Sequence, residues 1–505
     1  MKCNTPLLNL CGTFIFVLFL HSAMAQPAAL GVFTNNADVG ATKTAGKTSY
    51  DPDKQSYTIS GSGQNIWSQK DEFQYAYRKM TGDFILRANV AFVGEGVDPH
   101  RKIGWMVRHS LEVNSPCALA AVHGDGLVSL QFRENPQSDM DQKAFTMTHA
   151  DVIQLERRGD TFIMSAAKMG ERFFEEQVSG IELGNEVYIG LSVCAHNPDV
   201  VETATFKNVR VIVPPKPDYV PYRDYIGSHI ELMDVATGDR KIVFSADNSW
   251  QAPNWMVDDN VFTVNSDGLL YDFDLRTGKP TKLETGAAVR NNNDHVLSFD
   301  GKQMGISSTP PEDGHSIIFT MPRKGGNPKR LTPNGPSYLH GWSPNAKELV
   351  YTAVRDKTWN IFKIPASGGQ EVQLTKTPGL DDGPEYTPDG KYIYFNSNRT
   401  GISQIWRMKP DGSNPEQVTF DELNDWFPHI SPDGKWIVFI SFPRTVDSGQ
   451  HPFYKHCYIR LMPITGGEPK IIGYIYGGQG SMNVPNWSPD GKRIAFVSNS
   501  AFLNY

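Results

Sequence analysis

With 505 residues the chain is long enough for two or three domains, and its 39% hydrophobic and 11% aromatic content is that of a globular protein with substantial buried cores. The formal net charge of -7 leaves no strongly basic surface, so the composition argues against nucleic acid as a partner. The same negative charge disfavours binding to other acidic polymers.

The first 25 residues have the pattern of an export signal. Lys2 supplies a positive start, Leu7–Leu20 is an apolar run, and Ala23–Ala25 before Gln26 fits a small-residue cleavage site. The apolar run is shorter than the ~20 residues that a membrane-spanning helix needs. We therefore expect residues 1–25 to be a signal peptide, no membrane span after its cleavage, and a periplasmic or secreted protein.

Cleavage would leave three cysteines, Cys117, Cys194 and Cys457, in the mature chain. Three thiols cannot form a disulfide framework, and each lies in a strand-like run, so we expect small buried hydrophobic side chains. A single bridge between Cys117 and Cys194 is the alternative, because an exported protein meets an oxidising compartment.

Residues 27–212 show the period-2 alternation of β-strands and no long amphipathic helical pattern. Four short stretches resemble concanavalin-like jelly-roll domains, which accompany carbohydrate-active modules: Gly63–Trp67, Tyr77–Asp83, Gly104–Arg108 and Ala204–Val209. The resemblance implies a β-sandwich with a jelly-roll topology and a role in carbohydrate binding.

A proline-rich joint follows in residues 213–226. Four prolines lie between Val213 and Pro221, a density that stiffens a short linker in an extended form. We expect this segment to separate two domains.

The rest of the chain, residues 227–505, is organised by a repeated turn sequence. Its best copies are Ser431–Gly434, Ser488–Gly491 and Thr387–Gly390, and weaker copies begin at Met256, Ser298 and Ser343. Proline presets the second position of such a turn and glycine takes the fourth, so the chain reverses between two strands. Six copies at intervals of about 42–57 residues predict a propeller with four-stranded blades.

The last copy lies too close to the C-terminus to complete its own blade. Two strand-like runs upstream, Ile230–Asp234 and Lys241–Phe244, could supply the missing outer strands. We expect the ring to close by pairing the two ends of the propeller region, which removes open sheet edges.

Trp487–Phe496 and the run Ser397–Gly412 are similar to the repeats of TolB propellers. The resemblance covers roughly residues 227–500. It implies an all-β protein with an N-terminal β-sandwich (jelly roll) followed by a six-bladed TolB-like β-propeller. TolB itself carries an α/β domain ahead of its propeller, so we do not carry over its Tol-Pal envelope role.

In a propeller, we expect the residues just before each innermost strand to gather at one mouth of the central channel. The members of this group are His295 with Asp294, His340 with Tyr338, Asp382 with Glu385, Asp425 and Trp426 with His429, and Asn483 with Asn486. Histidines and carboxylates could bind a divalent metal, provide a base and an acid for sugar chemistry, or line a hydrated channel. These alternatives stay open, and no motif requires a cofactor.

One long loop is predicted to overhang the same mouth. Residues 442–456 connect two strands of the fifth blade, where the fourth blade uses only 398–403. The candidate ligand-binding residues of this loop and its neighbouring blade are Arg444, His451, Tyr454, Lys455 and Gln479. Aromatic and basic side chains together suit stacking on a sugar and binding its carboxylate.

Two function classes follow from these patterns. The first is an exported protein that binds a glycan or an envelope protein at the channel mouth without catalysis. The second is a lyase or hydrolase that acts on uronate-containing saccharides at the same mouth. Oligogalacturonate lyases resemble such propellers and hold manganese through a histidine and glutamine cluster, but here only His429 matches, with Phe427 at the partner position.

Overall fold

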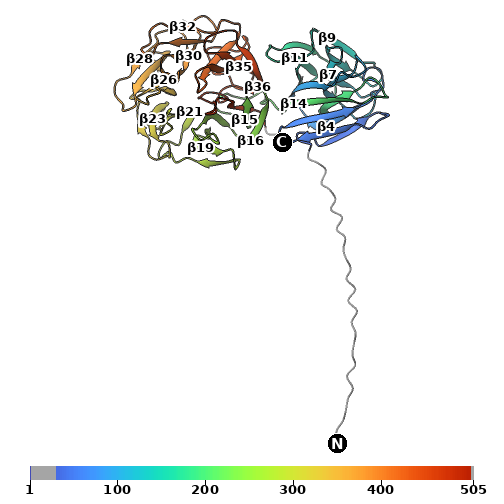
Figure 1. Ribbon diagram of the computed structural model, residues 1–505, viewed down its shortest axis with the longest axis horizontal. Coiled ribbons are helices and arrows are strands. Elements are labelled where there is room, and N and C mark those ends of the chain that lie inside the picture. Colours follow the sequence, from blue (N-terminus) through green and yellow to red (C-terminus); the bar gives the residue numbers. More distant parts are fainter. Residues whose placement is uncertain (2–29, 502–505) are drawn as a thin grey trace.

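The computed structural model describes residue 1 and residues 30–501, so residues 2–25 of the predicted signal peptide lie outside the described residues. Within them, every regular element is a β-strand. No helix in this part of the chain has the length and apolarity needed to cross a membrane. Figure 1 shows two bodies side by side, one built by the first fourteen strands and the other a ring of small sheets.

The N-terminal body consists of two seven-stranded antiparallel sheets. The first has the order β1-β4-β13-β6-β7-β8-β9, with β1 Asn35–Val39, β4 Phe73–Thr81, β13 Glu186–Cys194, β6 Lys102–Arg108, β7 Cys117–His123, β8 Leu127–Arg133 and β9 Asp141–Thr148. The second has the order β12-β11-β10-β5-β14-β3-β2, with β12 Phe174–Val178, β11 Thr161–Ala167, β10 Val152–Arg158, β5 Phe84–Val93, β14 Glu202–Ile212, β3 Ser56–Gly61 and β2 Lys47–Asp51.

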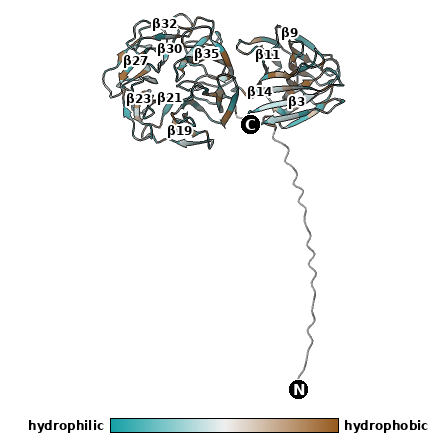
Figure 2. Cartoon of the chain, viewed as in Figure 1, coloured by the Kyte–Doolittle hydropathy of each residue, from teal (hydrophilic) through white to brown (hydrophobic). Residues whose placement is uncertain are grey.

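One hydrophobic core lies between these two sheets. Trp105 and Leu130 from the first sheet pack with Phe84, Leu86 and Phe162 from the second. Alternate residues of each strand enter this core, because successive side chains of a strand point to opposite faces. Figure 2 shows hydrophobic segments on the strands of both bodies. The predicted strands are confirmed, whereas the jelly-roll topology stays a prediction.

All three cysteines of the described chain are buried free thiols. Burial raises the pKa of Cys117 and of Cys194 to about 11. The predicted role as small buried side chains is confirmed, and the alternative bridge between Cys117 and Cys194 is not formed.

The second body is a six-bladed propeller. Five blades have four antiparallel strands each: β17 Trp250–Trp255, β18 Val261–Ser266, β19 Leu269–Asp274 and β20 Lys279–Lys282; β21 Asn291–Leu297, β22 Gln303–Ser308, β23 Ile317–Pro322 and β24 Lys329–Arg330; β25 Ser337–Trp342, β26 Glu348–Arg355, β27 Thr358–Pro365 and β28 Val372–Gln373; β29 Asp381–Tyr386, β30 Ile393–Ser397, β31 Gln404–Met408 and β32 Glu416–Gln417; β33 Asn424–Ile430, β34 Trp436–Phe442, β35 Lys455–Pro463 and β36 Lys470–Gly477.

The sixth blade closes the ring, as the sequence predicts. β15 (Ser228–Asp234) pairs with the last strand, β37 (Arg493–Asn499), and with β16 (Arg240–Ala246) on its other side. The repeated turns have the predicted chemistry. In Ser431–Gly434 the serine hydroxyl donates to Asp433 at 2.7 Å and Gly434 has a φ of 69°, a conformation that favours glycine.

A buried ion cluster joins the two bodies. Glu231 of β15 accepts hydrogen bonds from Arg210 of β14 at 2.6 Å and from Arg240 of β16 at 2.7 Å. Its carboxylate has no exposed surface. Nearby, the Tyr474 hydroxyl donates to the backbone oxygen of Glu171 at 2.6 Å, and Tyr474 packs with Val152 in a shared apolar cluster. The two bodies are therefore docked through buried contacts.

We propose residues 27–212 and 227–505 as two domains and 213–226 as the linker between them. Trypsin should cleave the native protein after Arg223, which is exposed. Because the domain contacts are buried, the two fragments should elute together in size-exclusion chromatography and separate only in denaturant. Fragments that separate in native buffer would contradict a stable interface.

Candidate functional site

The inner strand of five blades is interrupted by a β-bulge, which shapes the channel. The register shifts lie in β17, β21, β25, β29 and β33. Three bulges contain a residue with positive φ, namely Ala252, Gly383 and Phe427. A bulge locally breaks the alternation of the strand and re-aims its side chains, so polar residues can turn toward the channel.

A cluster around Asp382 lies on the side of the propeller where the inner strands begin. His340 Nε2 donates to Asp382 Oδ1 at 3.2 Å, and His451 Nε2 donates to Asp382 Oδ2 at 2.8 Å. Burial alone would raise the pKa of Asp382, but the hydrogen bonds from the two histidines outweigh it and hold the pKa well below its usual range. The blade-five loop is thus tied to the inner strands by a charged hydrogen bond.

Both ring nitrogens of His340 face hydrogen-bond acceptors, a geometry that favours the protonated imidazolium. Its Nδ1 faces the backbone oxygen of Asn483 at 3.3 Å while its Nε2 faces Asp382, so both nitrogens meet acceptors. Burial acts to lower the pKa of His340, but the hydrogen bond to Asp382 and its charge raise the pKa above the ordinary value. His340 and Asp382 therefore form a buried ion pair.

Asp294 of β21 is the second carboxylate of this cluster. Its residue surface is only 5% exposed, and it forms no ion pair with any other residue of the described chain. Burial raises its pKa to about 6, against the opposing effect of His340, while the charge of Asp382 adds to the rise. Two neighbouring carboxylates thus have pKa values pushed in opposite directions, an arrangement typical of functional sites.

The raised pKa of Asp294 predicts a specific pH dependence of stability. The stabilisation linked to its protonated form is fully present below the unfolded pKa of 3.8 and is lost as pH rises through about 6. Wild type should therefore lose stability as pH rises from 4 to 8, whereas Asp294→Asn should not. The difference in unfolding free energy between the variant and wild type should shift in favour of the variant by about 2–3 kcal/mol over this pH range. Urea unfolding at both pH values tests this, and a constant difference would contradict it.

Aromatic side chains border the cluster. Tyr338 stacks on Trp359 with ring centroids 5.7 Å apart. Tyr222 of the linker keeps 60% of its surface exposed, and its ring contacts Phe453 edge-on at 4.8 Å. Desolvation of its hydroxyl, followed by electrostatic coupling to the Tyr338 phenol and to the Asp382 carboxylate, raises the pKa of Tyr222 to about 12. Its φ of 63° is unusual for a bulky residue.

A chain of amides continues this border. Asn483 Nδ2 donates to Gln479 Oε1 at 3.1 Å, and Gln479 Nε2 donates to Asn293 Oδ1 at 3.5 Å. Asn293 Nδ2 donates in turn to Gln251 Oε1 at 2.9 Å. The mouth therefore combines carboxylates, imidazoles, amides and exposed aromatic surface.

The structure brings five of the predicted residues together at this mouth: His340, Asp382, His451, Gln479 and Asn483. His429 and Glu385 form a separate buried pair, with His429 Nδ1 and Glu385 Oε2 2.7 Å apart. Glu385 also lines a cavity of about 320 Å³ at the opposite end of the propeller, together with Trp255 and Trp342.

Three of the predicted residues take up other positions. His295 is fully buried against the backbone oxygen of Thr263, and burial lowers its pKa to about 4. Asp425 lies between strands, where it binds Arg460 at 3.1 Å, and burial raises its pKa to about 7. The side chain of Tyr454 packs against the linker and its hydroxyl accepts a hydrogen bond from the backbone of Ile226.

Arg444 and Lys455 are exposed at the ends of the blade-five loop. In residues 30–501 neither side chain has a hydrogen bond or ion pair to the Asp382 cluster. The bulges explain why most of the other predicted residues lie away from the Asp382 cluster. A shift of one residue in a strand turns a side chain expected in the channel into the blade, and turns its neighbour into the channel. The missed residue Tyr222 lies in a linker segment rich in tyrosine, a signal that the sequence does contain.

Comparison with known proteins agrees with this architecture. A family model described as the TolB beta propeller domain matches residues 340–448. The uncharacterized protein Atu1656 of Agrobacterium fabrum is 43% identical over 271 residues, which are 54% of this chain and 92% of that protein. The chain belongs to the TolB-like β-propeller family.

Two solved structures are similar to this chain. The TolB-like propeller superposes on the structure of a putative TolB from Agrobacterium tumefaciens with 41% identity and a TM-score of 0.53, over 56% of this chain and all of that one. TolB from Acinetobacter baumannii is 16% identical with a TM-score of 0.38, over 62% of this chain and 79% of that one.

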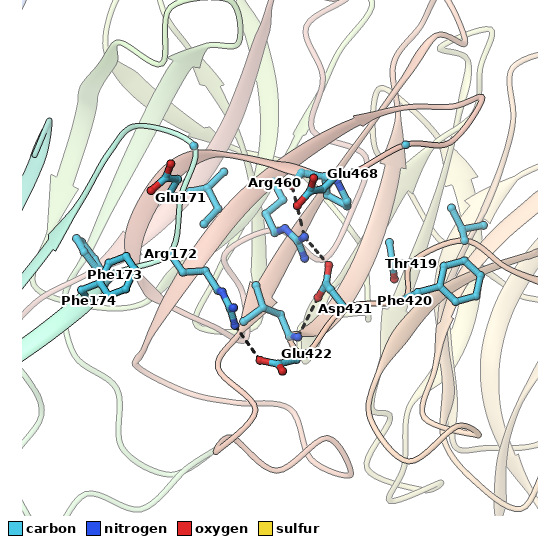
Figure 3. Close-up of a pocket in the computed structure, with 16 residues that line it drawn as sticks. Glu171, Arg172, Phe173, Phe174, Thr419, Phe420, Asp421, Glu422, Arg460 and Glu468 are labelled. Atoms are coloured by element: carbon cyan, nitrogen blue, oxygen red, sulfur yellow. Dashed lines mark hydrogen bonds and ion pairs between the residues drawn. The ribbon is translucent and has the colours of Figure 1, made fainter. Parts of the chain in front are cut away.

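A further cavity of the TolB-like protein, of about 650 Å³, lies at the junction of the two domains. Figure 3 shows Phe173 and Phe174 on one wall and Phe420 on the other, with Arg172 reaching across to Glu422. The Arg172 and Glu422 side chains are 3.1 Å apart.

Among residues 30–501, no group of three or more histidines, cysteines or carboxylates is arranged to hold a metal ion.

Proposed function

We propose that this exported TolB-like protein acts in the periplasm or outside the cell and binds a glycan or an envelope protein at the channel mouth, without catalysis. The observation that carries the proposal is the buried cluster in which His340 and His451 hold Asp382 beside Asp294. Export is supported by the signal pattern of residues 1–25.

The cluster is costly for folding, which supports a role in binding. Buried charges lose their hydration, and an apolar set of side chains of similar volume would often be as stable or more stable. Asp294 in particular is buried without an ion pair in the described chain. Titratable groups with strongly shifted pKa values concentrate at functional sites.

A glycan array and a pull-down from envelope extract would test the proposal with one pair of variants. His451→Ala should weaken binding of any retained ligand about tenfold or more, since one charged hydrogen-bonding group is lost at the mouth. Arg444→Ala in the same loop is the matched control, because Arg444 is exposed and outside the cluster. Equal binding by both variants would contradict a site at the mouth.

Catalysis is the second candidate, and the opposite pKa shifts of Asp294 and Asp382 favour it. A carboxylic acid that stays protonated near pH 6 beside an ionised carboxylate can serve as acid and base in a lyase or hydrolase. Product release from a panel of uronate-containing and neutral oligosaccharides tests this function. Turnover by wild type that falls at least a hundredfold in Asp294→Asn would establish it over simple binding.

A further inference from the structure

Three separate segments build the cavity of about 650 Å³ at the junction of the two domains. They are residues 170–174 at the start of β12, residues 418–423 after β32, and residues 467–471 around the turn between β35 and β36. The backbone amide of Ile471 donates to the Gly170 oxygen at 3.4 Å, so the first and third segments adjoin. Cavities between domains with volumes of about 300–1,000 Å³ are common ligand sites.

Two aromatic side chains of this cavity are left in solvent. Phe174 keeps 50% of its surface exposed and Phe420 keeps 76%, and they lie on opposite walls in Figure 3. Phe173, by contrast, packs on Tyr474 of the propeller with ring centroids 4.7 Å apart. The packing of the two domains therefore explains Phe173 but does not account for the two exposed rings.

The other blades provide an internal comparison for Phe420. In three blades a threonine hydroxyl accepts a hydrogen bond of 2.9–3.0 Å from the backbone amide of an isoleucine 14 residues earlier. Thr332 is followed by Pro333, Thr375 by Lys376 and Thr419 by Phe420. Because the same turn forms with proline or lysine at the next position, the fold does not require the phenylalanine. An exposed aromatic ring that folding does not require, beside a cavity, indicates a contact surface.

The charged groups that line the cavity leave two carboxylates unpaired. Its two arginines are already paired, Arg460 with Asp421 and Asp425 and Arg172 with Glu422. Glu171 and Glu468 also line the cavity, and neither forms an ion pair with another residue between positions 30 and 501. Lys470, although next to Pro469 in the chain, is not among the lining residues. The wall therefore carries excess negative charge beside exposed aromatic rings.

A basic side chain with an apolar neighbour is complementary to both features. The cation of a lysine or arginine is attracted to carboxylates and to an aromatic face, while its aliphatic stem covers apolar surface. The formal net charge of -7 of the whole chain acts in the same direction at longer range. An acidic ligand would be repelled by the same charges.

We infer that the junction cavity binds an extended basic segment of a partner protein. A lysine or arginine side chain of this segment lies against Glu171 and Glu468, and a neighbouring apolar side chain lies against Phe174 and Phe420. Such a segment contacts both domains at once, because the lining residues come from both. This site is separate from the channel mouth, so the inference goes beyond the proposed function.

The experiment uses the full mature chain and a hexapeptide of sequence Gly-Lys-Leu-Lys-Leu-Gly with both ends capped. Isothermal titration should give a Kd of about 100 µM or tighter. A matched peptide with glutamate for both lysines, and another with serine for both leucines, should each bind about tenfold more weakly or less well still, because one loses the charge attraction and the other the apolar contact.

Matched variants place the peptide on the protein. Glu171→Gln/Glu468→Gln and Phe174→Ala/Phe420→Ala should each weaken binding about tenfold or more. Both should keep the wild-type melting temperature, because all four side chains are exposed. Glu95→Gln/Glu312→Gln removes the same charge at exposed positions elsewhere and should bind the peptide like wild type.

Several results would overturn the inference. They are a basic peptide that does not bind, glutamate or serine peptides that bind as tightly, and wild-type affinity in either cavity variant. Equal binding of putrescine, a small diamine with the charge of the peptide, would show that a chain segment is not the occupant. A loss of peptide binding in His451→Ala would place the peptide at the mouth instead, whereas unchanged binding in this variant separates the two sites.

Discussion

Glu231→Ala should lower the free energy of unfolding by about 3–5 kcal/mol, because it leaves two buried guanidinium groups without their counter-ion. Arg210 and Arg240 both bind this carboxylate, and the Ser498 hydroxyl also donates to it. The arginines outweigh the effect of burial and hold the pKa of Glu231 well below its usual range. Denaturant unfolding at pH 7 is the measurement.

The same cluster predicts a pH effect and a control. The folded pKa of Glu231 is depressed, so its stabilisation is present above the unfolded pKa of 4.5 and is lost as pH falls below it. The loss of unfolding free energy caused by Glu231→Ala should therefore be smaller at pH 3 than at pH 7. Asp239→Ala removes an exposed partner of Lys207 at the same interface and should cost less than about 1 kcal/mol. A Glu231→Ala loss as small as the control would contradict the buried cluster.

Asp382→Ala should also lower the free energy of unfolding by a large amount. The structural change should be confined to the channel mouth. Removing this carboxylate leaves the buried imidazolium of His340 unpaired and releases His451 of the blade-five loop. The expected loss is about 3 kcal/mol at pH 7, with faster hydrogen exchange in residues 443–454. Unchanged exchange in this loop would show that the hydrogen bond between His451 and Asp382 does not anchor it.

The propeller could be predicted from the sequence because its signals are local. Each turn such as Ser431–Gly434 carries its own chemistry, and the ring closure follows from the absence of outer strands after Ser488. His340, Asp382 and His451 could be placed at one mouth because strand order fixes which ends meet.

Other features depend on contacts that no local pattern contains. A bulge in β21 leaves Asp294 in the mouth cluster and His295 in the blade wall, although the two are adjacent in sequence. The loop position of Tyr454 predicts a ligand contact, but its side chain packs against Tyr219 of the linker and its hydroxyl binds the backbone of Ile226. The docking of the domains through Glu231 likewise depends on residues far apart in the chain.

The central claim is that ligands bind at the channel mouth. One titration tests the mouth against the cavity of about 650 Å³ at the junction between the two bodies. The best glycan from the array would be titrated against the mouth variant Asp294→Asn/His451→Ala and the junction variant Phe174→Ala/Phe420→Ala, whose phenylalanines are exposed. We expect the mouth variant to lose at least a hundredfold in affinity and the junction variant to match wild type. Full affinity in the mouth variant with loss in the junction variant would contradict the account and place the site between the domains.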